Sequence, residues 1–208
     1  MLDPSFVPHI VAVGGTLRFG SSTERALRIV LKAAERAGAT TAIVAGPELE
    51  MPMYAPERTE RTESAQRLVR ELRAADGIVL GSPGYHGGIS GLVKNALDYT
   101  EDMRNDDLPY FDKRAVASVA TGGGWQGAVN TLAALRGIVH ALRGWNTPMG
   151  VAINTSEPLF DREGTCLNPR VEASLESLGL ELVEFSRMRQ GAVQGGYSAG
   201  EGLRAQAG

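Results

Sequence analysis

Short apolar runs alternate along the chain with longer stretches in which apolar residues recur every three or four positions. The short runs predict buried parallel strands, because a strand covered on both faces is apolar throughout; they lie at residues 9–13, 41–44, 78–80, 113–120 and 147–153. The recurring stretches predict helices with one apolar stripe; they lie at residues 24–37, 62–75, 89–97, 132–143 and 169–188. Strands and helices that alternate without an internal repeat predict a doubly wound, five-stranded parallel sheet with helices on both faces.

Glycine-rich loops directly follow three of these strands, at residues 14–23, 81–88 and 121–127. In an open α/β sheet, ligands bind outside the carboxyl ends of the strands. In the second loop we expect Ser82-Pro83-Gly84 to end the strand in a turn, and Gly87-Gly88 to take positive φ and leave the backbone bare for a ligand. The alternative is a connection that only reverses the chain, but three glycines and a tyrosine within five residues exceed what a reversal needs.

The first loop, G-T-L-R-F-G-S-S-T, places hydroxyls and one arginine at the start of a helix. Backbone N–H groups, hydroxyls and a guanidinium are what one phosphate dianion needs. Ser21 replaces the lysine of a triphosphate-binding loop, and G-x-G-x-x-G is absent, which disfavours a nucleoside triphosphatase and a dinucleotide-binding Rossmann fold. Ser21 and Glu24 also fit a capping box, so Ser21 caps the helix, binds an anion, or does both.

The composition is that of one ordinary globular domain: 208 residues, 43% hydrophobic and 22% charged. We expect this domain to span residues 1–190 and the Gly-, Ala-, Gln- and Ser-rich residues 191–208 to form a disordered tail. The tail contains G-x-S-x-G, but no strand precedes it and no Asp or His follows it, so it predicts no hydrolase. A net charge of −3 gives no general attraction to nucleic acid. With no membrane-spanning run and no secretion signal, a cytoplasmic protein is expected.

Metal binding finds little support in the sequence. Cys166 is the single cysteine and the three histidines lie far apart, which excludes an internal disulfide and disfavours a metal site built on thiolates or imidazoles. Residues 101–112 carry several carboxylates. Because they lack a calcium-loop pattern, a solvated acidic loop is favoured over a metal site.

The second loop and its helix, G-S-P-G-Y-H-G-G-I-S-G-L-V-K-N-A-L-D-Y, resemble the flavin-contacting segment of the NAD(P)H-dependent FMN reductase family. The family usually has Glu, Asn, Ser and Pro where this chain has Gly84, His86, Gly88 and Ser90. The first loop resembles the family's FMN-phosphate loop, with matching polar residues at Thr16, Arg18, Ser21 and Thr23. The segment M-P-M-Y at 51–54 and the helix with L-A-A-L-R also resemble family segments.

The resemblance implies a flavodoxin-like fold with strand order 2-1-3-4-5, in which the first and third strands are neighbours. It implies FMN as cofactor and NADPH or NADH as reductant. The flavin would carry the redox chemistry, so no catalytic side chain is expected. The implied cofactor-binding residues are Thr16, Arg18, Ser21, Ser22, Thr23, Pro83, Gly84, Tyr85, His86, Gly87, Gly88, Thr121, Gly122 and Gly123.

The resemblance also implies partners and leaves alternatives open. The electron acceptor would be a small molecule, such as a quinone, an azo compound or a metal oxyanion, or a flavin-dependent monooxygenase. A homodimer or homotetramer is expected, with support from the apolar residues 51–54. A non-catalytic electron carrier like flavodoxin is the alternative, against which the modest acidity and the helix after Gly88 count. A hydrolase using His86-Gly87-Gly88 as an oxyanion loop lacks a credible nucleophile.

Overall fold

The computed structural model describes residues 5–194 as alternating strands and helices. The strands are β1 (His9–Gly14), β2 (Thr40–Val44), β3 (Gly77–Tyr85), β4 (Gly88–Ile89), β5 (Ala115–Gly122), β6 (Trp145–Asn146) and β7 (Val151–Asn154). The α-helices are α1 (Ser22–Arg36), α2 (Glu63–Ala74), α3 (Gly91–Asp98), α4 (Trp125–Ala141) and α5 (Pro169–Gln194). Two short 3₁₀ helices, η1 (Gly46–Leu49) and η2 (Tyr99–Met103), complete the elements. No helix among the described residues is long and apolar enough to cross a membrane.

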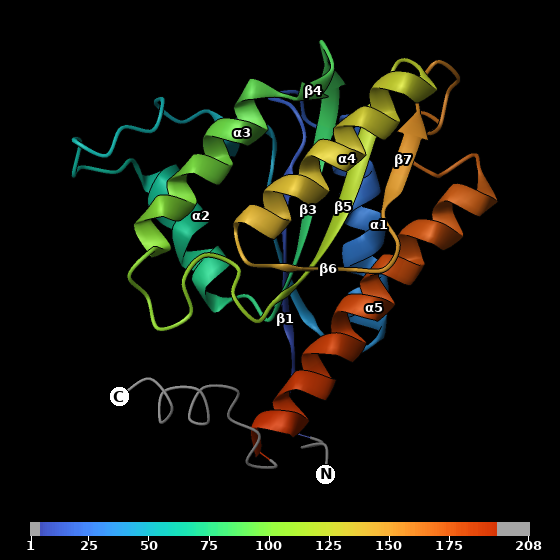
Figure 1. The fold of residues 1–208 in the computed structure, drawn as a ribbon. Helices are drawn as coiled ribbons and strands as arrows, with labels where there is room; N and C mark the ends of the chain where they lie inside the picture. Colours follow the sequence, from blue (N-terminus) through green and yellow to red (C-terminus); the bar gives the residue numbers. More distant parts are fainter. Residues whose placement is uncertain (1–4, 195–208) are drawn as a thin grey trace.

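The sheet has the order β2-β1-β3-β5-β6, with β7 also paired to β5, and these strands run parallel (Figure 1). The flavodoxin-like fold expected from the sequence is therefore confirmed, with one difference in detail. The fifth position holds two short strands, since β6 pairs with the start of β5 and β7 with its end. The strand expected at 147–153 is correct only for residues 151–153. Residues 147–150 lie between the two short strands, where Pro148 has no N–H to donate and the Thr147 hydroxyl donates to the Met149 carbonyl at 2.7 Å.

Helices cover both faces of the sheet (Figure 1). Alternate residues of β1 point to opposite sides: Val11 and Val13 enter the core beneath α2, α3 and α4, whereas Ile10 and Ala12 enter the core beneath α1 and α5. The strands are buried on both faces and are therefore apolar along their length. This two-sided core fixes the strands whose ends carry the glycine-rich loops.

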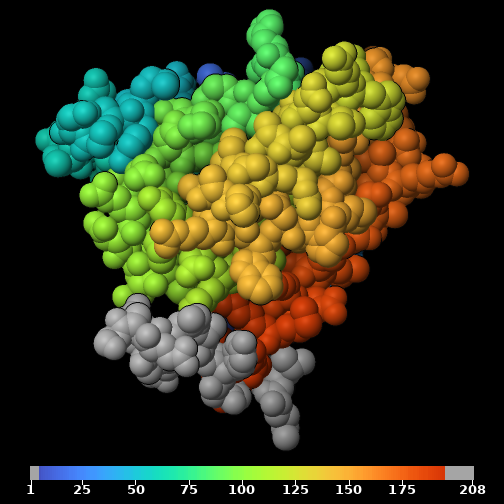
Figure 2. Space-filling view, in the orientation of Figure 1, coloured from blue at the N-terminus to red at the C-terminus, as the bar shows by residue number. Residues whose placement is uncertain are grey.

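The third strand is longer than its sequence predicts. The expected turn at Ser82-Pro83-Gly84 is wrong, because β3 continues through these residues and pairs with β5 as far as Pro83. Beyond Gly81, β1 no longer pairs with β3, so a proline without an N–H is tolerated at this sheet edge. The chain reverses later, at His86-Gly87, and returns as β4 antiparallel to β3. This hairpin projects from the surface (Figure 2).

The helix boundaries differ from the predicted ones at two places. Helix α1 begins at Ser22, with Ser21 as its N-cap, two residues before the expected start. Helix α5 continues to Gln194, four residues into the expected tail. The rest of that tail, including G-x-S-x-G at 196–200, lies outside the described residues, so the division into a domain and a tail stays a prediction.

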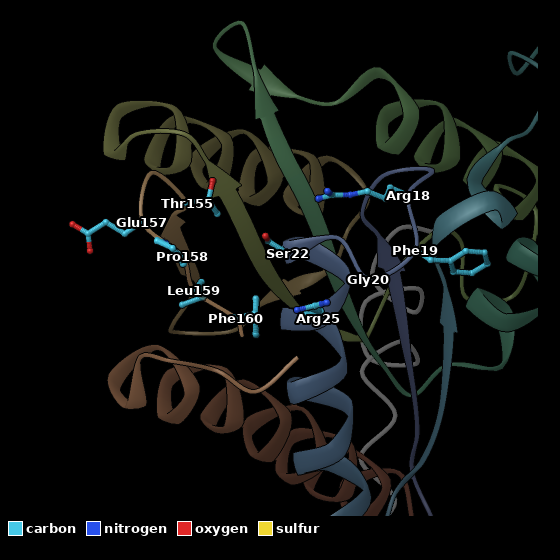
Figure 3. Close-up of a pocket in the computed structure, with 10 residues that line it drawn as sticks. All are labelled: Arg18, Phe19, Gly20, Ser22, Arg25, Thr155, Glu157, Pro158, Leu159 and Phe160. Carbon is cyan, nitrogen blue, oxygen red and sulfur yellow. The ribbon is translucent and has the colours of Figure 1, made fainter. Parts of the chain in front are cut away.

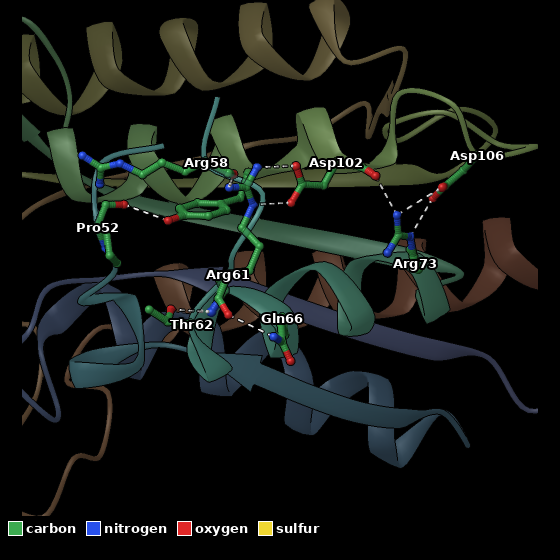
Figure 4. A network of polar contacts seen from close by, with 10 residues as sticks. Pro52, Arg58, Arg61, Thr62, Gln66, Arg73, Asp102 and Asp106 are labelled. Carbon is green, nitrogen blue, oxygen red and sulfur yellow. Dashed lines mark hydrogen bonds and ion pairs between the residues drawn. The ribbon is translucent and has the colours of Figure 1, made fainter. Parts of the chain in front are cut away.

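The acidic segment 101–112 is held by arginines and is not a freely solvated loop, which corrects the sequence-based expectation. Asp102 accepts two hydrogen bonds from Arg61, at 2.7 and 2.9 Å, and Asp106 pairs with Arg73 at 2.8 Å (Figure 4). The Arg61 guanidinium also stacks on the rings of Tyr54 and Tyr99. Hydrogen bonds from Arg61 lower the pKa of Asp102 below its ordinary value. No group of potential metal ligands occurs within residues 5–194.

Candidate functional site

Three glycine-rich loops lie at one edge of the sheet. Because β1, β3 and β5 are parallel neighbours, their carboxyl ends bring together the loops that follow them. The buried hydroxyls of Thr23 and Thr121 share a hydrogen bond of 2.7 Å, which joins the first loop's helix directly to the third loop. The structure thus places the sequence-predicted site residues in one region.

Several polar groups of the first loop form hydrogen bonds within the loop and the first turn of α1. The Ser21 hydroxyl accepts from Glu24 N at 3.3 Å, and the Glu24 carboxylate accepts from Gly20 N at 2.9 Å. The capping interpretation of Ser21 is therefore correct. Thr16 accepts a hydrogen bond from its neighbour Arg18 N at 3.2 Å.

The groups that remain open in this loop suit an anion. The guanidinium of Arg18 is exposed and the hydroxyl of Ser22 is half-buried. The first N–H groups of α1, those of Ser22 and Thr23, have no acceptor within the helix. A cation, a hydroxyl and backbone N–H groups together form a donor set for phosphate.

The first and second loops diverge from a very close contact between β1 and β3. A Cβ on Gly14 would lie 1.8 Å from the Gly81 carbonyl oxygen, so only glycine fits there. Gly15 N donates to the same oxygen at 3.2 Å. This contact sets the point at which the first loop leaves the sheet.

The second loop is anchored at its base and open at its tip. The buried Ser82 hydroxyl donates to the Pro83 carbonyl at 2.8 Å and accepts from Ser90 N at 2.9 Å. A side chain on Gly84 would meet the Thr131 hydroxyl of α4 at 2.5 Å. Gly84 therefore allows close packing on α4 and can face a ligand only through its backbone.

The tip of the hairpin is a two-residue turn. His86 has φ of 50° and Gly87 has φ of 90°, and Tyr85 pairs with Gly88 on either side of them. Two successive positive φ values characterise a type I′ turn, which matches the twist of a hairpin. Gly88 lies outside the positive-φ region, so the expectation of positive φ is correct for Gly87 and wrong for Gly88.

The third loop has one packed and one open side. Thr121 is buried and bonded to Thr23, and a side chain on Gly122 would meet Ala128 N of α4 at 2.8 Å. Beyond it, a Cβ on Gly123 or Gly124 would meet nothing within 4 Å, as at Gly87 and Gly88. Open backbone on two neighbouring loops leaves room for a flat ligand to approach.

A hollow of about 330 Å³ adjoins the first loop, and more than half of the residues that line it were missed by sequence reasoning (Figure 3). Arg18, Gly20 and Ser22 contribute from the first loop. The missed residues come from α1 and from the segment after β7; they are Arg25, Thr155, Glu157, Pro158, Leu159 and Phe160. The position of residues 155–160 at the carboxyl end of the last strand was the signal in the sequence that could have identified them.

The family model described as NADPH-dependent FMN reductase matches residues 8–157. This match covers every strand of the sheet and all three glycine-rich loops. The chain belongs to the NADPH-dependent FMN reductase family. The family's description names FMN and NADPH, in agreement with the cofactors expected from the sequence.

Curated relatives of this FMN reductase family member include azoreductases. The chain is 38% identical to the NADPH azoreductase of Bacillus sp. (strain OY1-2) over 84 residues, which are 40% of the chain and 44% of that protein. It is 30% identical to the FMN-dependent NADPH-azoreductase of Staphylococcus aureus (strain USA300) over 118 residues, or 57% of the chain and 59% of the relative. The chain thus matches these relatives over only about half their length.

Solved structures of flavoenzymes share the fold of this family member. The flavoenzyme NAD(P)H:(acceptor) oxidoreductase FerB from Paracoccus denitrificans superposes with a TM-score of 0.71 at 18% identity, covering 88% of this chain and 99% of FerB. The apo form of the NADH:FMN oxidoreductase EMOB superposes with a TM-score of 0.62 at 18% identity, covering 85% and 90%. At this identity the likeness shows the flavodoxin-like fold alone.

Proposed function

We propose that the protein is an NADPH-dependent FMN reductase, in which a hydride passes from NADPH to FMN and the electrons pass on to an acceptor. The observation that carries the proposal is the meeting of three glycine-rich loops at one sheet edge, in a chain that the family model covers from residue 8 to 157. This edge is where doubly wound sheets bind their ligands.

The residues at the site fit FMN in the chemistry of their donor groups. Arg18, the Ser22 hydroxyl and the first N–H groups of α1 would hold the phosphate. The open glycine backbones at 87–88 and 123–124 would admit the ring system, because a Cβ there meets nothing within 4 Å. The bound FMN would supply the hydride and electron chemistry, which the protein itself lacks.

The chain's own contribution is positioning and exclusion of water. The hairpin is fixed at its base by Ser82 and by the Thr131 hydroxyl, which donates to the Gly88 carbonyl at 3.2 Å. Tyr85 is 54% exposed at the hairpin and Trp125 is 61% exposed at the start of α4, so both aromatic side chains are available to cover a bound ring. Remaining predicted contacts, such as those of Thr16 and Thr121, support the loops through bonds within the protein.

An assay of NADPH oxidation tests the proposal directly: the decrease in NADPH absorbance is followed with the pure protein and added FMN. We expect the protein to oxidise NADPH when FMN is present. If it does so without any protein partner, a non-catalytic electron carrier is excluded. Absence of FMN-dependent NADPH oxidation would overturn the proposal.

The phosphate part of the proposal has its own test. Arg18→Ala should weaken FMN by about tenfold or more, because it removes a charge-assisted hydrogen bond, while riboflavin affinity stays unchanged. Equal affinities of the parent protein for FMN and riboflavin would contradict a phosphate contact at this loop.

The acceptor, the assembly and the location remain part of the proposal. Azo compounds are the first acceptors to test, because two curated relatives are named azoreductases; quinones and a partner monooxygenase follow. We also propose a homodimer or homotetramer, supported by the 73% exposure of the apolar Met53 side chain, and a cytoplasmic location. Light scattering that shows only a monomer at micromolar concentration would remove the assembly proposal.

A further inference from the structure

A second hollow, of about 240 Å³, is formed by the start of α4, the end of β7 and the start of α5. Its wall includes Trp125 of α4, Ile153 of β7 and Val171 of α5. Residues 157–159 line both this hollow and the one beside the first loop, so the two are neighbours. Trp125 directly follows Gly124, and the second hollow therefore also adjoins the third glycine-rich loop.

The second hollow has apolar side chains at its base and at its rim. Ile153 and Leu159 are buried, whereas Trp125 is 61% exposed and Leu167 is 55% exposed. The indole of a tryptophan packs favourably against a flat aromatic ring. A cavity of about 150 Å³ holds benzene, so a hollow of about 240 Å³ has room for one substituted aromatic ring.

The charges around the second hollow disfavour an anion. Glu157 is the one charged residue that lines it, and this carboxylate has no ion-pair partner among residues 5–194. Figure 3 shows the Glu157 side chain pointing away from the hollow beside the first loop. An unpaired carboxylate repels an anionic ligand, so the second hollow favours an uncharged one.

The start of α5 does not offset this preference. Pro169 has no N–H, and the N–H groups of Arg170 and Val171 donate to Asn168 Oδ1 at 3.1 and 3.3 Å. The N–H of Glu172 donates to the Asn168 carbonyl at 3.0 Å. The N–H groups that attract anions to a helix start are therefore already paired here.

Two amide side chains leave hydrogen-bond donors at the second hollow. Asn154 Oδ1 accepts from Ser156 N at 3.0 Å, and Asn168 Oδ1 is engaged by the start of α5. Neither Nδ2 group has an acceptor in the part of the chain that the structure describes. Each can donate to a nitrogen or oxygen carried by an aromatic ligand.

We propose that the second hollow binds one ring of an uncharged aromatic electron acceptor and discriminates against anionic acceptors such as sulfonated dyes. The inference rests on the proposed function and specifies the class of acceptor. Trp125 and Leu167 would cover the ring, Asn154 and Asn168 would donate to an azo nitrogen or a quinone oxygen, and Glu157 would repel an anionic substituent.

Two azobenzene dyes that differ in charge test the preference. Both carry a dimethylamino group on one ring, and the other ring carries either a sulfonate or a neutral sulfonamide. Their dissociation constants are measured by equilibrium dialysis with excess FMN and without NADPH, so that no turnover occurs. Because both dyes meet the same FMN-loaded protein, an effect of a substitution on FMN binding cancels in the ratio of the two constants.

The variant that tests the charge is Glu157→Lys, and its matched control is Glu163→Lys. Glu163 is exposed in the same segment between β7 and α5 but does not line the second hollow, so the control makes the same change in net charge elsewhere. The parent should bind the sulfonamide dye about tenfold more tightly than the sulfonate dye. Glu157→Lys should abolish this preference, and Glu163→Lys should change the ratio by less than about twofold.

The apolar rim is tested by Leu167→Ser, with Leu180→Ser as its control. Leu180 is 51% exposed on α5 and does not line the second hollow. Leu167→Ser should weaken the binding of both dyes by about fivefold and lower kcat/KM for the sulfonamide dye to a similar extent. Reduction of FMN by NADPH in stopped-flow measurements should stay within about twofold of the parent rate, and Leu180→Ser should change neither quantity.

Three results would overturn the inference. The parent could bind the two dyes equally, the two lysine variants could shift the ratio equally, or Leu167→Ser could slow FMN reduction by NADPH without affecting the dyes. The last result would assign the second hollow to the nicotinamide nucleotide. Failure of the proposed function is distinguishable, because dialysis shows whether and how the dyes bind even to a protein that does not oxidise NADPH.

Discussion

Alanine substitutions at the two adjacent glycines of the hairpin should have different effects on stability. Gly87 has φ of 90°, which L-residues rarely adopt, whereas Gly88 lies outside that region. A Cβ at either position would meet nothing within 4 Å, so neither substitution causes a clash. The pair therefore separates backbone strain from steric exclusion.

The magnitude follows from the backbone alone. A non-glycine residue in a left-handed conformation costs about 1–2 kcal/mol. Both substitutions also restrict the unfolded chain, which stabilises a protein by about 0.4–1 kcal/mol where the native backbone is compatible. Because this second contribution is common to both variants, the difference between Gly87→Ala and Gly88→Ala should equal the strain, about 1–2 kcal/mol.

Equilibrium unfolding in urea measures the difference. With a typical slope of about 2 kcal/mol per molar urea, the two midpoints should lie roughly 0.5–1 M apart, with Gly87→Ala the less stable variant. Coincident midpoints would refute the assignment of a type I′ turn to His86-Gly87. Gly88→Val extends the test to function. It should leave the free energy of unfolding nearly unchanged. A loss of FMN affinity in this stable variant would indicate that the flavin ring approaches the Gly88 backbone.

Three further outcomes follow from contacts described above. His86→Asn should keep FMN reduction within about tenfold in stopped-flow measurements, because Asn adopts positive φ as readily as His and the imidazole has no required proton transfer. Asn95→Ala should cost about 2 kcal/mol in thermal unfolding, since the Asn95 amide bonds to Met51 O, Pro52 O and Tyr54 N. Hydrogen bonds from Arg61 lower the pKa of Asp102 below its ordinary value. This pair therefore stabilises the fold above about pH 4, and its contribution is lost as pH falls through the lowered pKa. Asp102→Asn should therefore flatten the acid side of the stability curve in urea titrations.

The order of elements could be predicted from sequence because the hydrophobic period changes sharply between strands and helices. The ends of the elements could not. Ser82-Pro83-Gly84 has the composition of a turn, yet β5 offers pairing partners up to Thr121 and holds these residues in β3. Tertiary pairing overrode the local preference there.

The candidate site was predictable in part. Glycines that follow apolar runs identify the three loops in the sequence, at residues 14–23, 81–88 and 121–127. Sequence could not tell which of their hydroxyls bond within the protein, as Thr23 does with Thr121 across 98 positions. Arg25 was missed for the same reason: its setting depends on residues 160–164, which are distant in sequence and carry no motif.

Helix α5 has a consequence for how the protein is made. Its Gly179 lies so close to α1 that a Cβ there would be 2.3 Å from the Val30 carbonyl oxygen. Leu178 and Leu182 of α5 belong to the core between the sheet and helices α1 and α5. During synthesis, an intermediate that contains the strands but not yet α5 would leave this apolar face open to water. Such an intermediate exposes apolar surface to aggregation and to chaperones, and the docking of α5 covers this surface.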